Sequence, residues 1–75
     1  MTSAPKDKPA VGMIGLGIMG SAMAANLAKA GFPVHGFDPV AGARARLKRA
    51  GGHPCMNATD VAKHARFLVL SLPSV

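Results

Sequence analysis

Three glycines and one aspartate have the types and spacing needed to bind a dinucleotide. Gly15, Gly17 and Gly20 form a Gly-x-Gly-x-x-Gly pattern, and Asp38 follows 18 residues after the last glycine. In this pattern Gly15 permits a sharp turn, Gly17 lets the backbone approach a pyrophosphate, and Gly20 lets a helix pack closely on a strand. Asp38 can accept hydrogen bonds from the ribose hydroxyls of an adenosine. These residues predict a dinucleotide-binding site.

The segments around these residues alternate between strands and helices. Apolar strands are expected over 10–15 and 34–38, and an Ala-rich helix over 18–30 aims its free N–H groups at the phosphate. The sequence further predicts a helix over 40–50, a short strand over 53–56, a helix over 57–65 with Asn57 as its N-cap, and a strand over 66–72. The inner faces of the first two helices are expected to contain Met19, Met23, Leu27 and Ala30, and Ala43, Leu47 and Ala50.

This alternation predicts an α/β fold, namely the N-terminal part of a Rossmann doubly wound parallel sheet with strand order 3-2-1-4. Ligands bind such sheets where the order of strands reverses, so the loops over 15–20 and 71–74 should border one crevice. The candidate cofactor-binding residues are Gly15, Leu16, Gly17, Ile18, Met19, Gly20, Asp38, Leu72 and Pro73. For Met19 two interpretations stay open, because it could cover the cofactor or fill the interface between helix and sheet.

Composition excludes several other kinds of chemistry. The chain has no glutamate, and its carboxylates are Asp7, Asp38 and Asp60, so there is little material for a paired-carboxylate acid/base mechanism. Cys55 is the only cysteine, which rules out an intrachain disulfide or a cysteine zinc site and suits a reducing cytoplasm. The remaining candidate groups form no catalytic or metal-binding pattern and are interpreted as structural or surface residues: His35, His53, His64, Ser71 and Ser74.

The net charge of +6 raises the question of an anionic partner. Four of the nine basic residues lie in the segment 44–49, on a predicted helix. They are expected to form a solvated helix face, or else to contact an anionic cofactor. No aromatic residues alternate with these charges, so we expect no nucleic-acid platform.

A second alternative concerns membranes. Residues 10–28 are uncharged and follow Lys6 and Lys8, as in a signal peptide or a membrane span. Four glycines within this stretch argue against it, because each costs about 1 kcal/mol inside a helix. No membrane partner is therefore expected.

The length of 75 residues is short for this fold, which usually needs about twice as many. We therefore expect a piece of a longer protein, with a flexible lead-in over 1–9, a partial NAD(P)-binding Rossmann domain over 10–75, and no C-terminal helical substrate domain. Such a piece alone should be inactive and should fold poorly.

Three segments together carry a family resemblance. They are Gly15-Leu16-Gly17-Ile18-Met19-Gly20, then Met23-Ala24-x-Asn26-Leu27-x-Lys29-x-Gly31, and finally Leu72-Pro73-Ser74. The sequence resembles the β-hydroxyacid dehydrogenases, which include 3-hydroxyisobutyrate dehydrogenase, 2-hydroxy-3-oxopropionate reductase and 6-phosphogluconate dehydrogenase. The resemblance covers about residues 10–75.

The resemblance implies NAD or NADP as cofactor and reversible hydride transfer between nicotinamide and a small hydroxyacid, by a homo-oligomeric cytoplasmic enzyme. It implies a lysine as general acid/base beyond residue 75, so no catalytic residue is assigned within this chain. Members that use NADP commonly carry Asn-Arg or Ser-Arg where this chain has Asp38-Pro39, which favours NAD, although Arg44 leaves NADP possible. A non-catalytic dinucleotide-binding or sensing module on the same half-fold is the alternative function.

Overall fold

Strands and helices alternate along the chain, as the sequence predicts. The computed structural model describes residues 8–71, so the predicted site residues Leu72 and Pro73 lie outside the described part. The elements are β1 (Val11–Ile14), α1 (Ile18–Lys29), β2 (Val34–Phe37), α2 (Ala41–Arg49), β3 (His53–Pro54), α3 (Ala58–His64) and β4 (Phe67–Leu70). Their types and order agree with the prediction, and each is somewhat shorter than expected.

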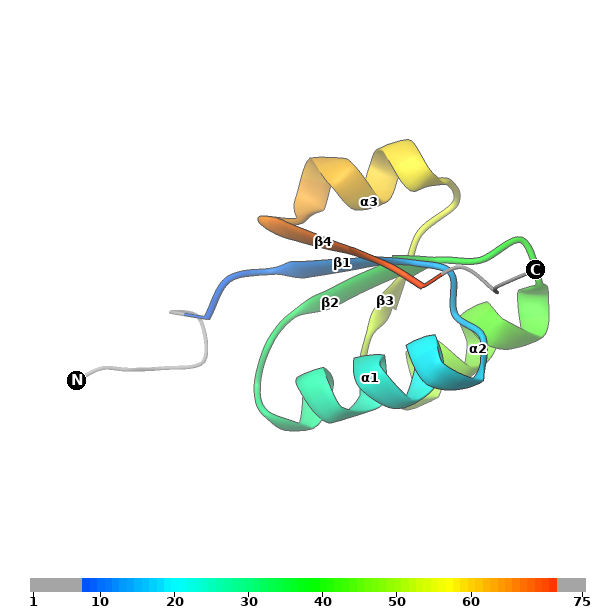
Figure 1. Cartoon of the computed structure of the whole chain (residues 1–75), viewed down its shortest axis with the longest axis horizontal. Coiled ribbons are helices and arrows are strands. Elements are labelled where there is room, and N and C mark those ends of the chain that lie inside the picture. Colours follow the sequence, from blue (N-terminus) through cyan, green and yellow to red (C-terminus); the bar gives the residue numbers. More distant parts are fainter. Residues whose placement is uncertain (1–7, 72–75) are drawn as a thin grey trace.

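The strands form one parallel sheet with the order β3-β2-β1-β4 (Figure 1). Central strand β1 pairs on both sides, so that Val11 lies opposite Val34 of β2 and opposite Phe67 of β4. The predicted order and the predicted α/β fold class are thereby confirmed. Because all strands run the same way, the carboxyl ends of β1, β2 and β4 meet at one edge of the sheet.

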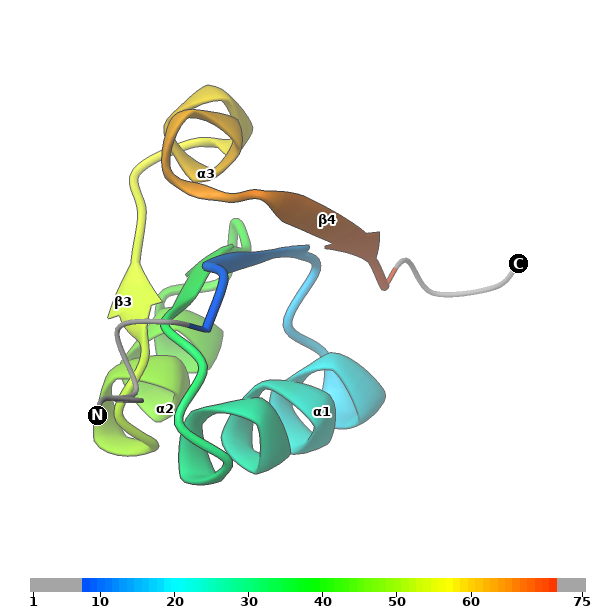
Figure 2. The ribbon, with the colours of Figure 1, turned by 90° about the vertical axis from the view of Figure 1, so that its left-hand side faces the viewer.

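Helices cover both faces of the sheet. Helices α1 and α2 lie on one face and α3 lies on the other (Figure 2). The buried cluster between the sheet and the α1–α2 layer consists of Met13, Leu16, Ala24, Val34, Ala43 and Leu47. This cluster anchors α1 against β1 and so fixes where the N-terminus of α1 points.

The prediction for the inner face of α1 is wrong for its methionines. Met19 is 77% exposed and Met23 is 43% exposed, whereas the buried residues of α1 are Gly20 and Ala24. A Cβ added to Gly20 would overlap the carbonyl oxygen of Gly15. The helix therefore approaches the strand too closely for a long side chain to lie between them. Of the two interpretations of Met19, filling the helix–sheet interface is excluded.

Further details differ from the prediction. Ala30 and Ala50 are exposed rather than buried, because α1 ends at Lys29 and α2 at Arg49, and each alanine is already the C-cap of its helix. Strand β3 covers only His53–Pro54, and the Cys55 N–H that follows it donates to the Gly36 carbonyl of β2 at 2.7 Å. The predicted N-cap of α3 is confirmed, since the Asn57 side chain accepts a hydrogen bond from the Asp60 N–H at 2.8 Å.

Within residues 8–71, no helix is both long and apolar enough to cross a membrane. The uncharged stretch over 10–28 is divided instead into β1, the glycine turn and most of α1.

Candidate dinucleotide-binding site

A crevice of about 650 Å³ opens at the edge where the carboxyl ends of β1, β2 and β4 meet. Its lining residues are Ile14, Gly15, Gly17, Ile18, Met19, Phe37, Asp38, Pro39, Val40 and Ser71. Five of the predicted site residues are among them, together with Ser71 from the predicted second loop. The structure thus brings the loop over 15–20 and the end of β4 to one crevice, as expected at the point where the strand order reverses.

Backbone hydrogen bonds join the glycine turn to both neighbouring strands. The Gly15 N–H donates to the Phe37 carbonyl at 2.9 Å, and the Ser71 N–H donates to the Ile14 carbonyl at 2.9 Å. Gly15 has a φ of 97°, and a Cβ there would overlap the Ser71 carbonyl oxygen. Glycine is therefore required at this position by both the backbone conformation and the close approach of β4.

Gly17 differs from the other two glycines of the motif. Its φ is −71°, which any residue adopts, and apart from its two chain neighbours no atom of residues 8–71 lies within 4 Å of the place where its Cβ would be. Packing within the described part of the chain therefore does not require glycine here. The space beside Gly17 belongs to the crevice, so a side chain at this position would enter the crevice.

The N-terminus of α1 is open toward the crevice. Gly17 is the N-cap, no side chain caps the helix, and the first turn carries no acidic residue. Uncapped N–H groups and the positive end of the helix dipole favour an anion at this position. Gly17 and Ile18, which begin the helix, both line the crevice.

Asp38 follows the end of β2 and lies opposite the glycine turn. Its Oδ2 accepts the Leu16 N–H at 2.7 Å and its Oδ1 accepts the Val40 N–H at 2.9 Å. These two donors, the Leu16 N–H first, hold the pKa of Asp38 below its ordinary value. The group is therefore a carboxylate at neutral pH, and each oxygen keeps a further lone pair for a ligand hydroxyl.

Arg44 reaches back from α2 to the end of β2. Its Nη1 donates to the Asp38 carbonyl oxygen at 2.6 Å. The Arg44 guanidinium thus lies next to the backbone of Asp38, and the positive charges of Arg46 and Arg44 both act on the Asp38 carboxylate.

Two predicted site residues do not line the crevice. The Leu16 side chain is fully buried in the core, and Gly20 lies buried beneath the turn. Conversely, four lining residues were not predicted from the sequence: Ile14, Phe37, Pro39 and Val40. These residues lie at or just after the carboxyl ends of β1 and β2, and this position in the sequence could have predicted that they line the crevice.

Three histidines that seemed unrelated in the sequence lie together. The ring of His35 on β2 stacks on that of His53 at 4.9 Å and on that of His64 at 5.0 Å, measured between ring centroids. His35 and His53 are paired in the strand register, so aligning the predicted strands would have revealed this contact. No group of three or more His, Cys, Asp or Glu residues in the described part of the chain could hold a metal ion.

The histidine stack should make stability depend on pH. Partial burial, and then the neighbouring His53 and His64, lower the pKa of His35 from its ordinary value of 6.5. The unfolded chain then binds more protons than the folded one, so we expect the free energy of unfolding to fall as pH decreases through about 6.5. Urea denaturation of the full-length protein expected from the sequence, between about pH 7.5 and 5.5, measures this loss, which should shrink in His35→Gln. An equal loss in both proteins would contradict the prediction. The lowered pKa of Asp38 affects the free energy of unfolding only near or below pH 3.8, the ordinary pKa of an aspartate, and so does not contribute in this range.

The fold and the crevice define the first half of a doubly wound, dinucleotide-binding domain. A family model described as the NAD binding domain of 6-phosphogluconate dehydrogenase matches residues 10–75. The chain therefore belongs to this family of NAD-binding domains. The predicted family is confirmed, and so is the prediction that the domain binds NAD.

Individual relatives are oxidoreductases. The chain is 42% identical over 65 residues to 3-sulfolactaldehyde reductase of Escherichia coli. The matched stretch covers 87% of this chain and 22% of that reductase. It is 40% identical over 68 residues to mitochondrial 3-hydroxyisobutyrate dehydrogenase of Rattus norvegicus. This match covers 91% of this chain and 20% of that dehydrogenase. Among solved structures, 3-hydroxyisobutyrate dehydrogenase of Mycobacterium tuberculosis with L-serine superposes on the chain with a TM-score of 0.85 at 33% sequence identity. The superposition covers 88% of this chain and 23% of that structure's chain. The chain spans about a fifth of the length of the curated relatives it matches.

Proposed function

We propose that the chain is the cofactor-binding portion of an NAD(P)-dependent oxidoreductase that transfers a hydride between nicotinamide and a β-hydroxyacid. The substrate would be 3-hydroxyisobutyrate, as the names of two relatives suggest, or tartronate semialdehyde or a similar small molecule, as the family resemblance implies. The observation that carries this proposal is the meeting of the open α1 N-terminus, Gly17 and the Asp38 carboxylate in one crevice. A pyrophosphate and an adenosine ribose need these groups side by side.

Each group has a distinct part in binding. The α1 N-terminus and the backbone at Gly17 would hold the pyrophosphate, and Asp38 would accept the ribose hydroxyls with its remaining lone pairs. Met19, which is exposed at the rim, would cover the cofactor. When bound, the nicotinamide supplies the chemistry of hydride transfer. The described residues serve to bind and orient it.

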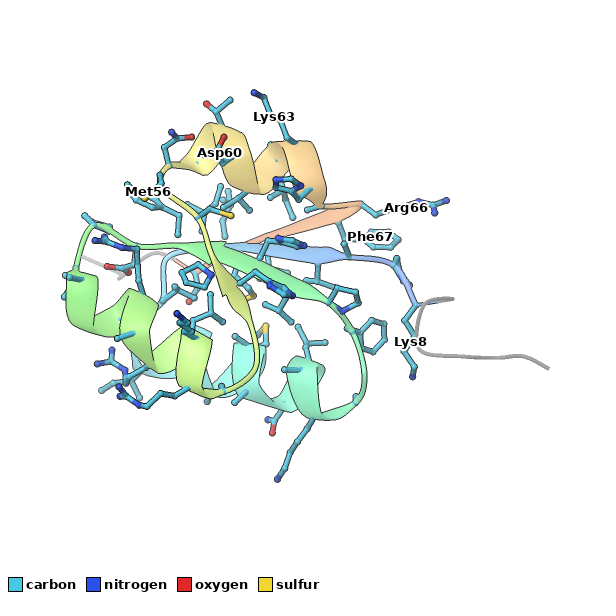
Figure 3. All side chains as sticks on the ribbon, turned by 180° about the vertical axis from the view of Figure 1, so that it is seen from behind. Lys8, Met56, Asp60, Lys63, Arg66 and Phe67 are labelled. Atoms are coloured by element: carbon cyan, nitrogen blue, oxygen red, sulfur yellow. The ribbon has the colours of Figure 1, made fainter. Side chains whose placement is uncertain are left out.

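We further propose that the complete protein continues into a C-terminal helical domain that carries the substrate site and the general acid/base lysine. Strand β4 supports this, because Phe67, Leu68 and Leu70 are 58%, 50% and 64% exposed. Figure 3 shows Phe67 beside Arg66 at the start of that strand. An apolar strand at a sheet edge is normally covered by further structure. We also propose that the whole enzyme is cytoplasmic and homo-oligomeric.

An activity assay tests the proposed function. The full-length protein, meaning the proposed longer chain, should form NADH from NAD with at least one member of a panel of small β-hydroxyacids. The isolated 75 residues should show no turnover and no cooperative thermal transition, because β4 remains uncovered. Cooperative unfolding together with turnover by the isolated chain would contradict the proposed division. Cofactor binding by the full-length protein without turnover on any hydroxyacid would favour a non-catalytic binding module.

The preference between the two cofactors should follow the charge of Asp38. An NADP 2′-phosphate would lie beside this carboxylate, and two like charges at close range should cost about 1–3 kcal/mol, or roughly fivefold to over a hundredfold in affinity. We expect a higher kcat/KM with NAD than with NADP, and Asp38→Asn should narrow the ratio. Arg44→Gln should widen it by removing the neighbouring cation. A wild-type preference for NADP would mean that Arg44 dominates this end of the crevice.

A further inference from the structure

The backbone of Leu16, in the middle of the glycine turn, is held from both sides. The Leu16 N–H donates to Asp38 Oδ2 at 2.7 Å, and the Leu16 carbonyl accepts a hydrogen bond from Ser21 Oγ at 2.8 Å. The first contact comes from the residue directly after β2, 22 residues further along the chain, and the second comes from the first turns of α1. We propose that Asp38 and Ser21 are positioning residues that hold the turn in its phosphate-binding shape before the cofactor arrives. This inference rests on the proposed function.

The turn needs such support because of its own sequence. Leu16 lies between Gly15 and Gly17, and glycine gives a backbone many alternative conformations. A turn that bound the pyrophosphate only after ordering would lose affinity to the entropy of that ordering. The buried Leu16 side chain fixes one point of the turn, and the two hydrogen bonds fix the planes of the peptide groups before and after it.

Asp38 is itself held in place for this task. Its second oxygen accepts the Val40 N–H at 2.9 Å, and its carbonyl oxygen accepts from Arg44 Nη1 at 2.6 Å. The carboxylate is therefore aimed at the turn without any ligand. Its usual interpretation, a partner for the ribose hydroxyls, explains neither the Leu16 contact nor the orientation in the free protein.

Ser21 separates positioning from ligand contact. It is not among the residues that line the crevice, so its hydroxyl has no direct route to the cofactor. Its backbone N–H makes the helical hydrogen bond to the Gly17 carbonyl at 2.7 Å, and its hydroxyl separately donates to the Leu16 carbonyl. Ser21→Ala removes only the hydroxyl, and Ser21→Thr retains it. Any loss of cofactor affinity in Ser21→Ala must therefore act through the turn.

Two measurements on the full-length protein test the proposal. The first is hydrogen exchange of the Leu16 amide without ligand, and the second is the affinity for NAD and for an NAD analogue that lacks both adenosine ribose hydroxyls. Ser21→Ala and Asp38→Asn should speed exchange at Leu16 and weaken binding of the analogue by about threefold to tenfold, the value of one ordinary hydrogen bond. Ser21→Thr should restore both properties. Asp60→Asn is the control, since Asp60 lies on α3 and does not line the crevice.

The opposite results would overturn the proposal. If Asp38 serves only the ribose, Asp38→Asn weakens NAD but binds the analogue as the wild type does, and Leu16 exchanges at the wild-type rate. If Ser21→Ala leaves both exchange and affinity unchanged, the hydroxyl has no positioning role. If the wild type fails to bind NAD, the proposed function fails, whereas Leu16 exchange in the free protein still decides whether Asp38 and Ser21 hold the turn.

Discussion

Gly17→Val should weaken NAD binding to the full-length protein by at least about tenfold, which corresponds to about 1.4 kcal/mol. A side chain at this position would enter the space through which the backbone must approach the pyrophosphate. The free energy of unfolding should change by no more than about 1 kcal/mol, the cost of a poorer N-cap, because the site is open and the backbone angle is ordinary. Calorimetry and urea denaturation measure the two quantities separately.

The matched control for this substitution is Gly42→Val. Gly42 is the other described glycine with no atom within 4 Å of the place where a Cβ would be, but it lies on α2 and does not line the crevice. The control should bind NAD as the wild type does. Unchanged affinity in Gly17→Val would mean that the glycine pattern serves only the turn between strand and helix.

Gly20→Val should have the opposite signature, with its main effect on stability. Even the first carbon of the new side chain would overlap the Gly15 carbonyl oxygen and lie 3.1 Å from Ser71 Oγ. Because the obstructing atom belongs to the backbone of the turn, α1 must move away from β1. Overpacking of this kind costs about 1–3 kcal/mol, and the added methyl groups place Gly20→Val toward the upper end.

Urea denaturation of the full-length protein measures this loss as a lower midpoint. Gly42→Ala is the control, and it should leave the midpoint equal to or above that of the wild type because alanine is the better helix former. A midpoint for Gly20→Val equal to that of the wild type would show that α1 can shift away from β1 without cost. The close packing that places the α1 N-terminus at the crevice would then be dispensable.

The architecture could be predicted because its signals are local and repeated. Apolar strands alternate with helices, which predicts a parallel sheet, and the glycine pattern after the first strand favours the Rossmann order that is observed. The inner face of α1 could not be obtained from helical periodicity, which favoured Met19 and Met23. The distance between helix and sheet decides that face, and it depends on Gly20 packing against the backbone of Gly15.

The site was predictable in its position and less so in its contacts. The glycine pattern and Asp38 indicated the crevice, yet Leu16 has its N–H bound to Asp38 and its side chain in the core. That contact joins positions 22 residues apart and depends on the path of the turn, which no spacing rule describes. The stacking of His35, His53 and His64 likewise depends on strand register and on the placement of α3.

The central claim is that NAD binds where the α1 N-terminus faces Asp38, and amide hydrogen exchange with and without NAD tests it most directly. In the full-length protein, saturating NAD should slow exchange most strongly in peptides that cover residues 15–21 and 37–40, which contain the lining residues of the turn and of the end of β2. Peptides from α3, on the other face of the sheet, should exchange at the same rate in both states (Figure 2). Protection confined to other segments, with none at the glycine turn, would contradict the account.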